Sequence, residues 1–139
     1  MSLRNKLLCL LIDDDEDDQE LFALTLEDLH APITLHIANN GFDGLSLLRS
    51  EQIKPDYIFL DLNMPRMNGK ECLRLLKEDR ALQNIPVVIF STSDEIQDIT
   101  DTKALGALDF ISKPALTSEL TILLQHFFTR HHPNLILNP

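Results

Sequence analysis

The sequence has only two cysteines, and neither is placed to form a cross-link or a metal site. Cys9 lies within an apolar run, and Cys72 lies within a stretch of helical periodicity. Their spacing matches neither a disulfide framework nor a zinc motif. We therefore interpret both residues as thiols of the core.

Long apolar runs are also absent. The first run, residues 7–12, is six residues long and leads directly into acidic residues, although Arg4 and Lys6 precede it. A secretory signal needs a longer apolar stretch, so we expect a strand here and a cytosolic protein with no membrane contact.

Positive charge is scarce. Twelve lysines and arginines stand against 22 aspartates and glutamates, which gives a net charge of -10. Such a chain repels nucleic-acid phosphates and anionic lipids, so direct binding to either is disfavoured. A cation or a basic partner fits this charge better.

Length and composition predict one globular domain. The chain has 139 residues, of which 44% are hydrophobic and 24% are charged, as is typical of folded proteins. It contains no internal repeat or linker, so we expect a single domain over residues 1–139. We place its core at about residues 6–130 and a short tail at residues 131–139.

Short apolar runs alternate with amphipathic segments along the whole chain. The runs predict five strands, at residues 7–12, 34–38, 57–60, 87–90 and 108–111. The segments between and after them have helical spacing. Strict alternation implies right-handed crossovers and a parallel sheet that is covered on both faces. The predicted fold is α/β, a (βα)5 doubly wound five-stranded parallel sheet.

Helix boundaries are marked by residues with capping chemistry. Asn40 precedes Gly41 and Asn68 precedes Gly69, each at an expected helix start. Residues 92–95 resemble a capping box for the fourth helix. Gly106 is the expected end of that helix, because the residue after a helix often adopts positive φ.

Polar residues follow the apolar runs where the strands should end. Because ligands bind at the carboxyl ends of strands in open parallel sheets, these positions are candidates for function. They are Asp13, Asp14, Asp61, Ser91, Thr92, Lys113 and Pro114.

Six consecutive acids occupy residues 13–18. We interpret residues 15–18 as the solvated start of a helix, where carboxylates favour the positive end of the helix dipole. Asp13 and Asp14 instead adjoin a buried strand near Asp61, and carboxylates this close need protonation or a bridging cation. A small number of hard oxygen ligands is the set that Mg²⁺ prefers. A calcium loop is disfavoured because its sixth position is Asp18 rather than glycine and its twelfth is Leu24.

Asp61 alone could simply cap a loop, but its expected neighbours favour a role in phosphoryl transfer. A carboxylate beside Mg²⁺ can attack phosphorus and form an acyl phosphate. Lys113 could neutralise charge on the phosphoryl oxygens, and the Ser91 hydroxyl could donate a hydrogen bond to them.

These motifs resemble the receiver domain of two-component response regulators over about residues 6–130. LLIDDD at residues 10–15 resembles the acidic motif of that family, and DLNMP at residues 61–65 with Gly69 resembles its phosphoacceptor loop. Ser91 and Lys113-Pro114 match its hydroxyl and lysine positions. The resemblance implies a flavodoxin-like strand order 2-1-3-4-5 and a cis Lys113–Pro114 peptide.

The resemblance also implies a role for each site residue. Asp61 would accept the phosphoryl group and bind Mg²⁺, or Mn²⁺ in its place, together with Asp14. Asp13 would act through water, and the Asn63 backbone carbonyl would complete the protein ligands. Ser91 and Phe110 would form the switch, with Thr92 and Pro114 as secondary residues.

The partners implied are a sensor histidine kinase or histidine phosphotransfer protein, a downstream protein target, and a second copy of the chain upon phosphorylation. Family members signal through the fourth helix, fifth strand and fifth helix, here about residues 94–130. No basic helix-turn-helix segment follows Arg130, so we expect a stand-alone receiver that acts by protein contact.

Two other functions compete with this interpretation. A receiver-like scaffold could bind its partners without phosphorylation, although the acceptor, the acids and the lysine are all present. A haloacid-dehalogenase-like phosphatase also uses Mg²⁺ and an aspartate nucleophile. Its second aspartate is replaced here by Asn63, which cannot act as a general acid or base, and its nucleophile lies on the first strand.

Overall fold

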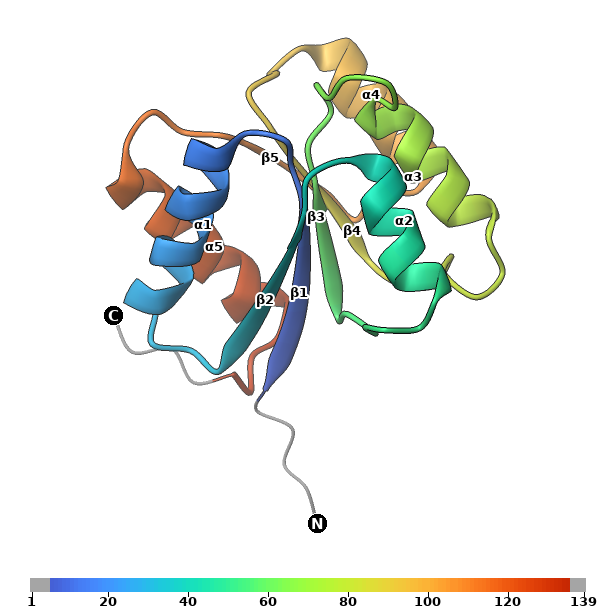
Figure 1. The fold of residues 1–139 in the computed structure, drawn as a ribbon. Coiled ribbons are helices and arrows are strands. Elements are labelled where there is room, and N and C mark those ends of the chain that lie inside the picture. Colours follow the sequence, from blue (N-terminus) through green and yellow to red (C-terminus); the bar gives the residue numbers. More distant parts are fainter. Residues whose placement is uncertain (1–5, 136–139) are drawn as a thin grey trace.

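Five strands alternate with five helices in the computed structural model, which describes residues 6–135 (Figure 1). The elements are β1 Leu7–Ile12, α1 Glu16–Asp28, β2 Ile33–Ala38, α2 Gly41–Arg49, β3 Tyr57–Leu60, α3 Gly69–Glu78, β4 Val87–Ser91, α4 Ile96–Leu105, β5 Asp109–Ser112 and α5 Thr117–His131. Each predicted strand lies within one or two residues of an observed strand.

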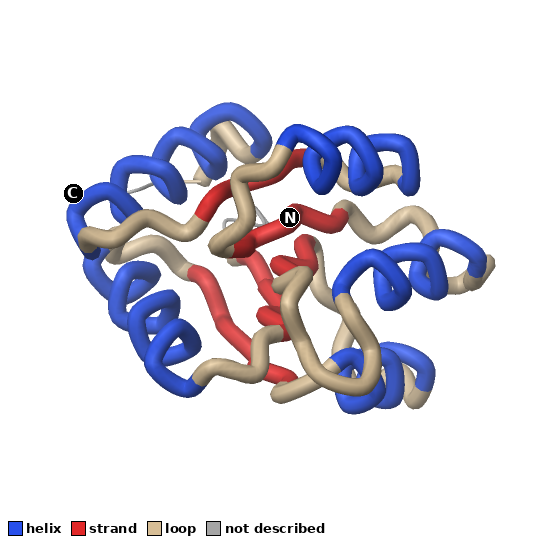
Figure 2. Tube along the Cα trace, turned by 90° about the horizontal axis from the view of Figure 1, so that it is seen from above, coloured by secondary structure: helices blue, strands red, loops and turns tan. Residues whose placement is uncertain are grey.

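The strands form one parallel sheet in the order β2-β1-β3-β4-β5. This confirms the predicted doubly wound α/β fold and its flavodoxin-like strand order. Helices α1 and α5 cover one face of the sheet, and α2, α3 and α4 cover the other (Figure 1). Seen from above, the strands form a central layer with helices on either side (Figure 2).

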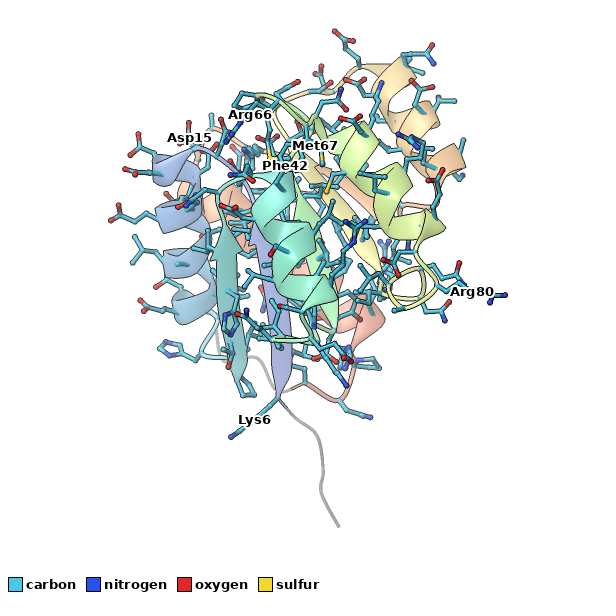
Figure 3. The ribbon with its side chains drawn as sticks, turned by 45° about the vertical axis from the view of Figure 1, so that its right-hand side comes forward. Lys6, Asp15, Phe42, Arg66, Met67 and Arg80 are labelled. Atoms are coloured by element: carbon cyan, nitrogen blue, oxygen red, sulfur yellow. The ribbon has the colours of Figure 1, made fainter. Side chains whose placement is uncertain are left out.

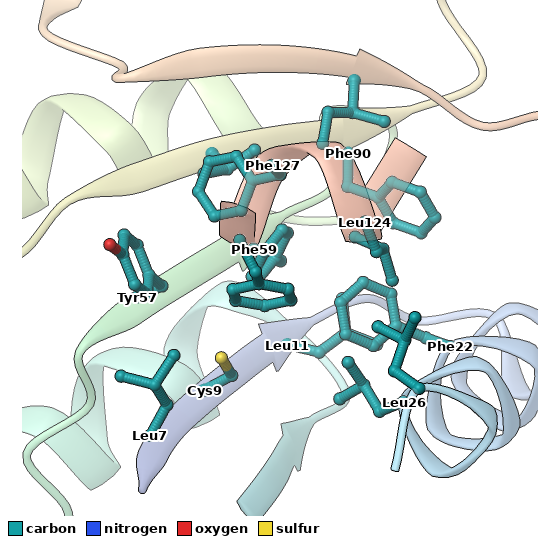
Figure 4. Close-up of a cluster of buried hydrophobic side chains, with 14 of the residues drawn as sticks. Leu7, Cys9, Leu11, Phe22, Leu26, Tyr57, Phe59, Phe90, Leu124 and Phe127 are labelled. Atoms are coloured by element: carbon teal, nitrogen blue, oxygen red, sulfur yellow. The ribbon is translucent and has the colours of Figure 1, made fainter. Parts of the chain in front are cut away.

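Two apolar clusters hold these layers together. The cluster beneath α1 and α5 contains several phenylalanines, and Phe22 packs edge to face against both Phe59 and Phe90, with ring centroids 5.0 and 5.3 Å apart (Figure 4). The second cluster lies beneath α2 and α3. Strands β3 and β4 are buried at every position, which explains why their sequences are continuously apolar rather than alternating.

The folded core extends beyond the predicted end at residue 130. Helix α5 continues to His131, and Leu135 packs into the cluster beneath α1 and α5. The hydroxyl of Tyr57 lies 3.0 Å from Nδ1 of His132, which fixes the chain after the helix. Ile136 and Leu137, the other apolar residues of the tail, lie outside the described residues.

Helix ends agree with most of the predicted boundaries. The side chains of Asn40 and Asn68 cap α2 and α3, and Gly106 ends α4 with a φ of 107°. The capping box at residues 92–95 is wrong, since α4 begins after Glu95 and that side chain makes no cap bond. The Ser93 hydroxyl donates instead to the carboxylate of Asp98.

The apolar residues of α4 are partly exposed. Ile96 and Ile99 contribute to the helical spacing that predicts this helix, and they are 81% and 39% exposed. Thr102 is the buried residue of this helix. Its hydroxyl donates to the Asp98 carbonyl within the helix at 2.8 Å, so it buries no unpaired polar group.

Two salt bridges connect helix α4 to helix α3. The ammonium of Lys70 lies 2.6 Å from a carboxylate oxygen of Asp98 and 2.9 Å from one of Asp101. The hydrogen bond from Lys70, followed by that from Ser93, lowers the pKa of Asp98. The hydrogen bonds from Lys70 and Gln97 lower the pKa of Asp101 in the same way.

Within the part of the chain that the structure describes, no helix combines the length and apolar character needed to span a bilayer.

Gly69 permits α3 to start directly against β3. Its amide donates to the Leu62 carbonyl at 2.9 Å. A Cβ built on Gly69 would overlap the carbonyl oxygen of Asp61 and lie 2.6 Å from the Leu62 Cα. Because these neighbours are backbone atoms, no side-chain rotation can relieve the clash.

Replacing Gly69 with alanine is therefore expected to destabilise the fold by about 1–3 kcal/mol, the usual cost of overpacking. Gly41→Ala is the control, because its Cβ would meet the flexible end of Met67 at 2.6 Å. Urea unfolding should show a clearly larger loss for Gly69→Ala. Equal stabilities of the two variants would show that the loop backbone yields without cost.

Replacing Lys70 with methionine should give a pH-dependent loss of stability. The lowered pKa values of Asp98 and Asp101 stabilise the fold above the unfolded pKa of about 3.9, and this contribution disappears as the pH falls through the folded values. Urea unfolding should therefore show a small deficit at pH 7 that closes below about pH 4. Lys54→Met, which removes an 81% exposed lysine, should show no such convergence.

Candidate functional site

The carboxyl edge of the sheet brings the predicted acids together. Asp13 follows β1 and Asp61 follows β3, and these strands are direct neighbours. The Asp61 amide donates to the Ile12 carbonyl at 3.0 Å, which continues the sheet bonding to the last residue before the loop. Figure 3 places Asp15, at the start of α1, at the end of the molecule opposite Lys6. The acids therefore lie at the edge where the strands end.

Asp13, Asp14 and Asp61 form one acidic cluster. Each offers a carboxylate oxygen, and the three oxygens all lie within 4.8 Å of one another. Asp13 and Asp61 are buried, whereas Asp14 is exposed, so the cluster opens to solvent on one side. Hard oxygen ligands in an open site, with mutual repulsion that a cation relieves, fit a divalent metal ion. The three residues could therefore bind one.

Asn63 lies in the loop after Asp61. Its amide approaches Asp61 Oδ1 at 3.4 Å, and its side chain is exposed. The loop therefore follows the rim of the acidic cluster. The role of the Asn63 carbonyl as a metal ligand stays a prediction.

Lys113 directly follows the edge strand β5, and its side chain extends to the acidic cluster. Its ammonium lies 2.8 Å from Asp13 Oδ2 and 3.5 Å from Asp61 Oδ2, and only 7% of its side chain is exposed. Its backbone amide donates to the Ser91 carbonyl at 2.7 Å. The predicted cis peptide before Pro114 is wrong, since no cis bond occurs among the described residues. The trans form is the intrinsically favoured one for such bonds.

Burial dominates the electrostatics of Asp13. It raises the pKa of the Asp13 carboxyl by more than the hydrogen bond and charge of Lys113 lower it. Burial is also the largest single effect on Lys113 and lowers its pKa, but the hydrogen bonds to Asp13 and Asp18 together with the charges of Asp13 and Asp61 outweigh it, so the Lys113 pKa rises. The ammonium therefore stays charged at neutral pH, and the buried carboxyl still favours additional positive charge.

The predicted hydroxyl and aromatic residues flank this site. Ser91 is fully buried at the end of β4, and its Oγ accepts a long 3.4 Å bond from the Ser93 amide. Thr92, the next residue, is exposed. Phe110 on β5 is half-buried and packs against the cluster beneath α2 and α3. The switch roles of Ser91 and Phe110 stay predictions.

Sequence reasoning missed two side chains of the site. Asp18, which we interpreted as a solvated acid of the helix start, is only 32% exposed, and its Oδ2 lies 2.7 Å from the Lys113 ammonium. Gln19 donates to the Asp13 carbonyl at 2.7 Å and to the Asn39 side chain at 2.8 Å, which ties the first loop to the second. Neither residue stands out within its run of polar residues.

The chain matches the response regulator receiver domain family over residues 9–125. Protein PilH of Pseudomonas aeruginosa is 38% identical over 101 residues, which cover 72% of this chain and 81% of PilH. The two-component response regulator-like protein APRR1 of Arabidopsis thaliana is 30% identical over 128 residues, which cover 91% of this chain but 20% of APRR1.

Solved structures of response regulators have the same fold. The Mn²⁺-bound form of response regulator Rcp1 has 25% sequence identity and a TM-score of 0.82. The phosphorylated cyanobacterial phytochrome response regulator RcpA has 28% identity and a TM-score of 0.83. Each comparison covers 96% of this chain and 99% of the other.

The family match spans most of the chain, and the relatives share the fold that carries the acidic cluster. This excludes the haloacid-dehalogenase-like phosphatase. Family membership also implies a histidine kinase as partner. The chain belongs to the receiver domains of two-component response regulators, which are phosphoacceptor signalling domains rather than enzymes.

Proposed function

We propose that this receiver accepts a phosphoryl group on Asp61 from a histidine kinase or a histidine phosphotransfer protein, with Mg²⁺ as cofactor. The observation that carries the proposal is the position of the Asp61 carboxylate. It is 5% exposed, belongs to the cluster with Asp13 and Asp14, and lies 3.5 Å from the Lys113 ammonium.

Asp14 and Asp61 would hold the metal ion directly, Asp13 would hold it through water, and the Asn63 carbonyl would complete the protein ligands. Mg²⁺ suits this set because it keeps several waters and takes few carboxylates. Mn²⁺ is the substitute, as the Mn²⁺-bound form of Rcp1 supports. The bound ion would supply positive charge to the oxygens of the incoming phosphoryl group.

The transfer itself is a displacement at phosphorus. One oxygen of the Asp61 carboxylate forms a bond to phosphorus as the bond from phosphorus to the donor histidine nitrogen breaks, and the electron pair stays on that nitrogen. Lys113 stabilises the negative charge of the phosphoryl oxygens from the buried side. The Ser91 hydroxyl donates a hydrogen bond to one of them.

The new group would act as a switch because it changes the local charge. A phosphoryl group adds about -1.5 to -2 charges. Charge-assisted bonds from Lys113, Ser91 and a backbone amide contribute ~1.5–3 kcal/mol each. Their sum is comparable with the ~5.5 kcal/mol that moves a two-state equilibrium from 1:99 to 99:1.

The conformational change after phosphorylation would appear on the surface that α4, β5 and α5 form. Ile99, Leu108 and Leu123 are large apolar residues exposed there. Ser91 precedes α4, and Phe110 lies on β5, so movement of either residue reaches this surface. Its occupant would be a downstream protein target or a second copy of the receiver upon phosphorylation.

Phosphorylation at Asp61 is tested by intact-mass measurement after incubation with acetyl phosphate and Mg²⁺. The wild-type protein should gain the mass of one phosphoryl group, and the gain should vanish when EDTA is added beforehand. Asp61→Asn should gain nothing, because an amide is not a nucleophile at phosphorus. An equal adduct on both proteins would remove Asp61 from this role, and no adduct on either would favour the phosphorylation-independent scaffold.

Coupling through Ser91 is tested with Ser91→Ala. This variant should still acquire the phosphoryl group, but the loss of one charge-assisted bond of ~1.5–3 kcal/mol should shift the switch equilibrium roughly tenfold or more. Beryllofluoride should therefore produce smaller NMR shift changes in the amides of α4 and β5 than in wild type. Ser46→Ala, at an exposed serine of α2, should respond fully; a full response of Ser91→Ala would contradict the coupling.

A further inference from the structure

Asp18 contacts the Lys113 ammonium as closely as Asp13 does, although Asp18 lies outside the acidic cluster. The distance from Nζ is 2.7 Å to Asp18 Oδ2, 2.8 Å to Asp13 Oδ2 and 3.5 Å to Asp61 Oδ2. Asp18 lies in the first turn of α1, 95 residues from Lys113 in the chain. It is not one of the three clustered acids.

Asp13 has two competing demands on its carboxylate. In the structure its Oδ2 faces the Lys113 ammonium, and its Oδ1 accepts the Asp15 amide at 3.0 Å. The proposed function also assigns Asp13 to the metal side of the pocket. A divalent ion there repels the ammonium and weakens its pairing with Asp13.

Asp18 can satisfy the ammonium in both situations because it stands outside the metal cluster. If Asp18 were neutral, Asp13 would be the nearest carboxylate left to Lys113. Binding of a metal ion to Asp13 would then leave the ammonium of Lys113, whose side chain is only 7% exposed, without a close carboxylate partner, which is costly. Asp18 removes this conflict between the metal ion and the lysine.

We propose that Asp18 is a positioning residue, which anchors the Lys113 ammonium beside Asp61 while Asp13 turns to the metal ion. This inference rests on the proposed function and adds to it a residue that acts through Lys113. Two consequences follow from the loss of Asp18: divalent ions bind more weakly, and the phosphoryl group transfers to Asp61 more slowly.

A purely structural role for Asp18 has a different signature. Acids in the first turn of a helix interact favourably with its dipole, and α1 begins with Glu16, Asp17 and Asp18. Asp17 lies in the same turn and is exposed. Asp17→Asn thus removes the same charge from the same turn without touching Lys113, and it serves as the matched control.

The test compares wild type, Asp18→Asn, Asp18→Glu and Asp17→Asn in two measurements. Calorimetric titration with Mg²⁺ gives the metal affinity without any phosphorylation, and intact mass against time with acetyl phosphate gives the transfer rate. Asp18→Asn should bind Mg²⁺ roughly tenfold more weakly and react roughly tenfold more slowly, as expected for a lost charge-assisted contact. Asp17→Asn should stay close to wild type, and Asp18→Glu should recover part of both values.

A Lys113→Met background separates positioning from long-range charge effects. Without the ammonium, adding Asp18→Asn should change the Mg²⁺ affinity no more than adding Asp17→Asn does. An undiminished effect of Asp18→Asn in that background would overturn the inference, as would identical behaviour of Asp18→Asn and Asp17→Asn in the wild-type background. A wild-type protein that binds no Mg²⁺ and forms no adduct at Asp61 would overturn the proposed function as well.

Discussion

The pairing of one buried ammonium with several carboxylates is the constraint on which the functional edge of the sheet depends. Asp13 and Asp61 are buried close together, an arrangement in which like charges repel. Lys113 supplies the compensating charge from within 3.5 Å of both. The pKa of Asp13 is nevertheless raised by burial. The cluster holds three carboxylates against this one ammonium, and this imbalance is what makes a divalent cation a fitting ligand.

Strand order explains why each type of residue stands where it does. Strands β1 and β3 are neighbours, so the short side chains of Asp13 and Asp61 meet without any special loop geometry. Lys113 follows β5, the edge strand beyond β4, and must reach across the end of β4 to the acids. A long side chain can cover that distance. Ser91 ends β4, the strand between β3 and β5, and is fully buried.

The sequence predicted those features that depend on local period and on parallel topology. Apolar runs locate all five strands because each run is bounded by polar residues, and parallel strands bring Asp13, Asp14 and Asp61 to one edge. The contact between Asp18 and Lys113 could not be predicted, since it joins side chains 95 residues apart and six consecutive acids look alike in sequence. The exposure of Ile96 could not be predicted either, because periodicity identifies an apolar stripe but not whether another element covers it.

A switch needs groups that can change partners, and in the proposed function Ser91 would be such a group. Its hydroxyl oxygen accepts a long 3.4 Å bond from Ser93, so little is lost when it turns to a new acceptor. Ser93 is itself tied through its hydroxyl to Asp98, and Asp98 is tied to Lys70 at the start of α3. A movement of Ser91 toward a phosphoryl group on Asp61 would therefore disturb the contacts that position the first turn of α4. The contacts from Ser91 through Ser93 and Asp98 to Lys70 lead from the end of β4 to α4 and α3. In the proposed function, one new charge at Asp61 would act on α4 through these contacts.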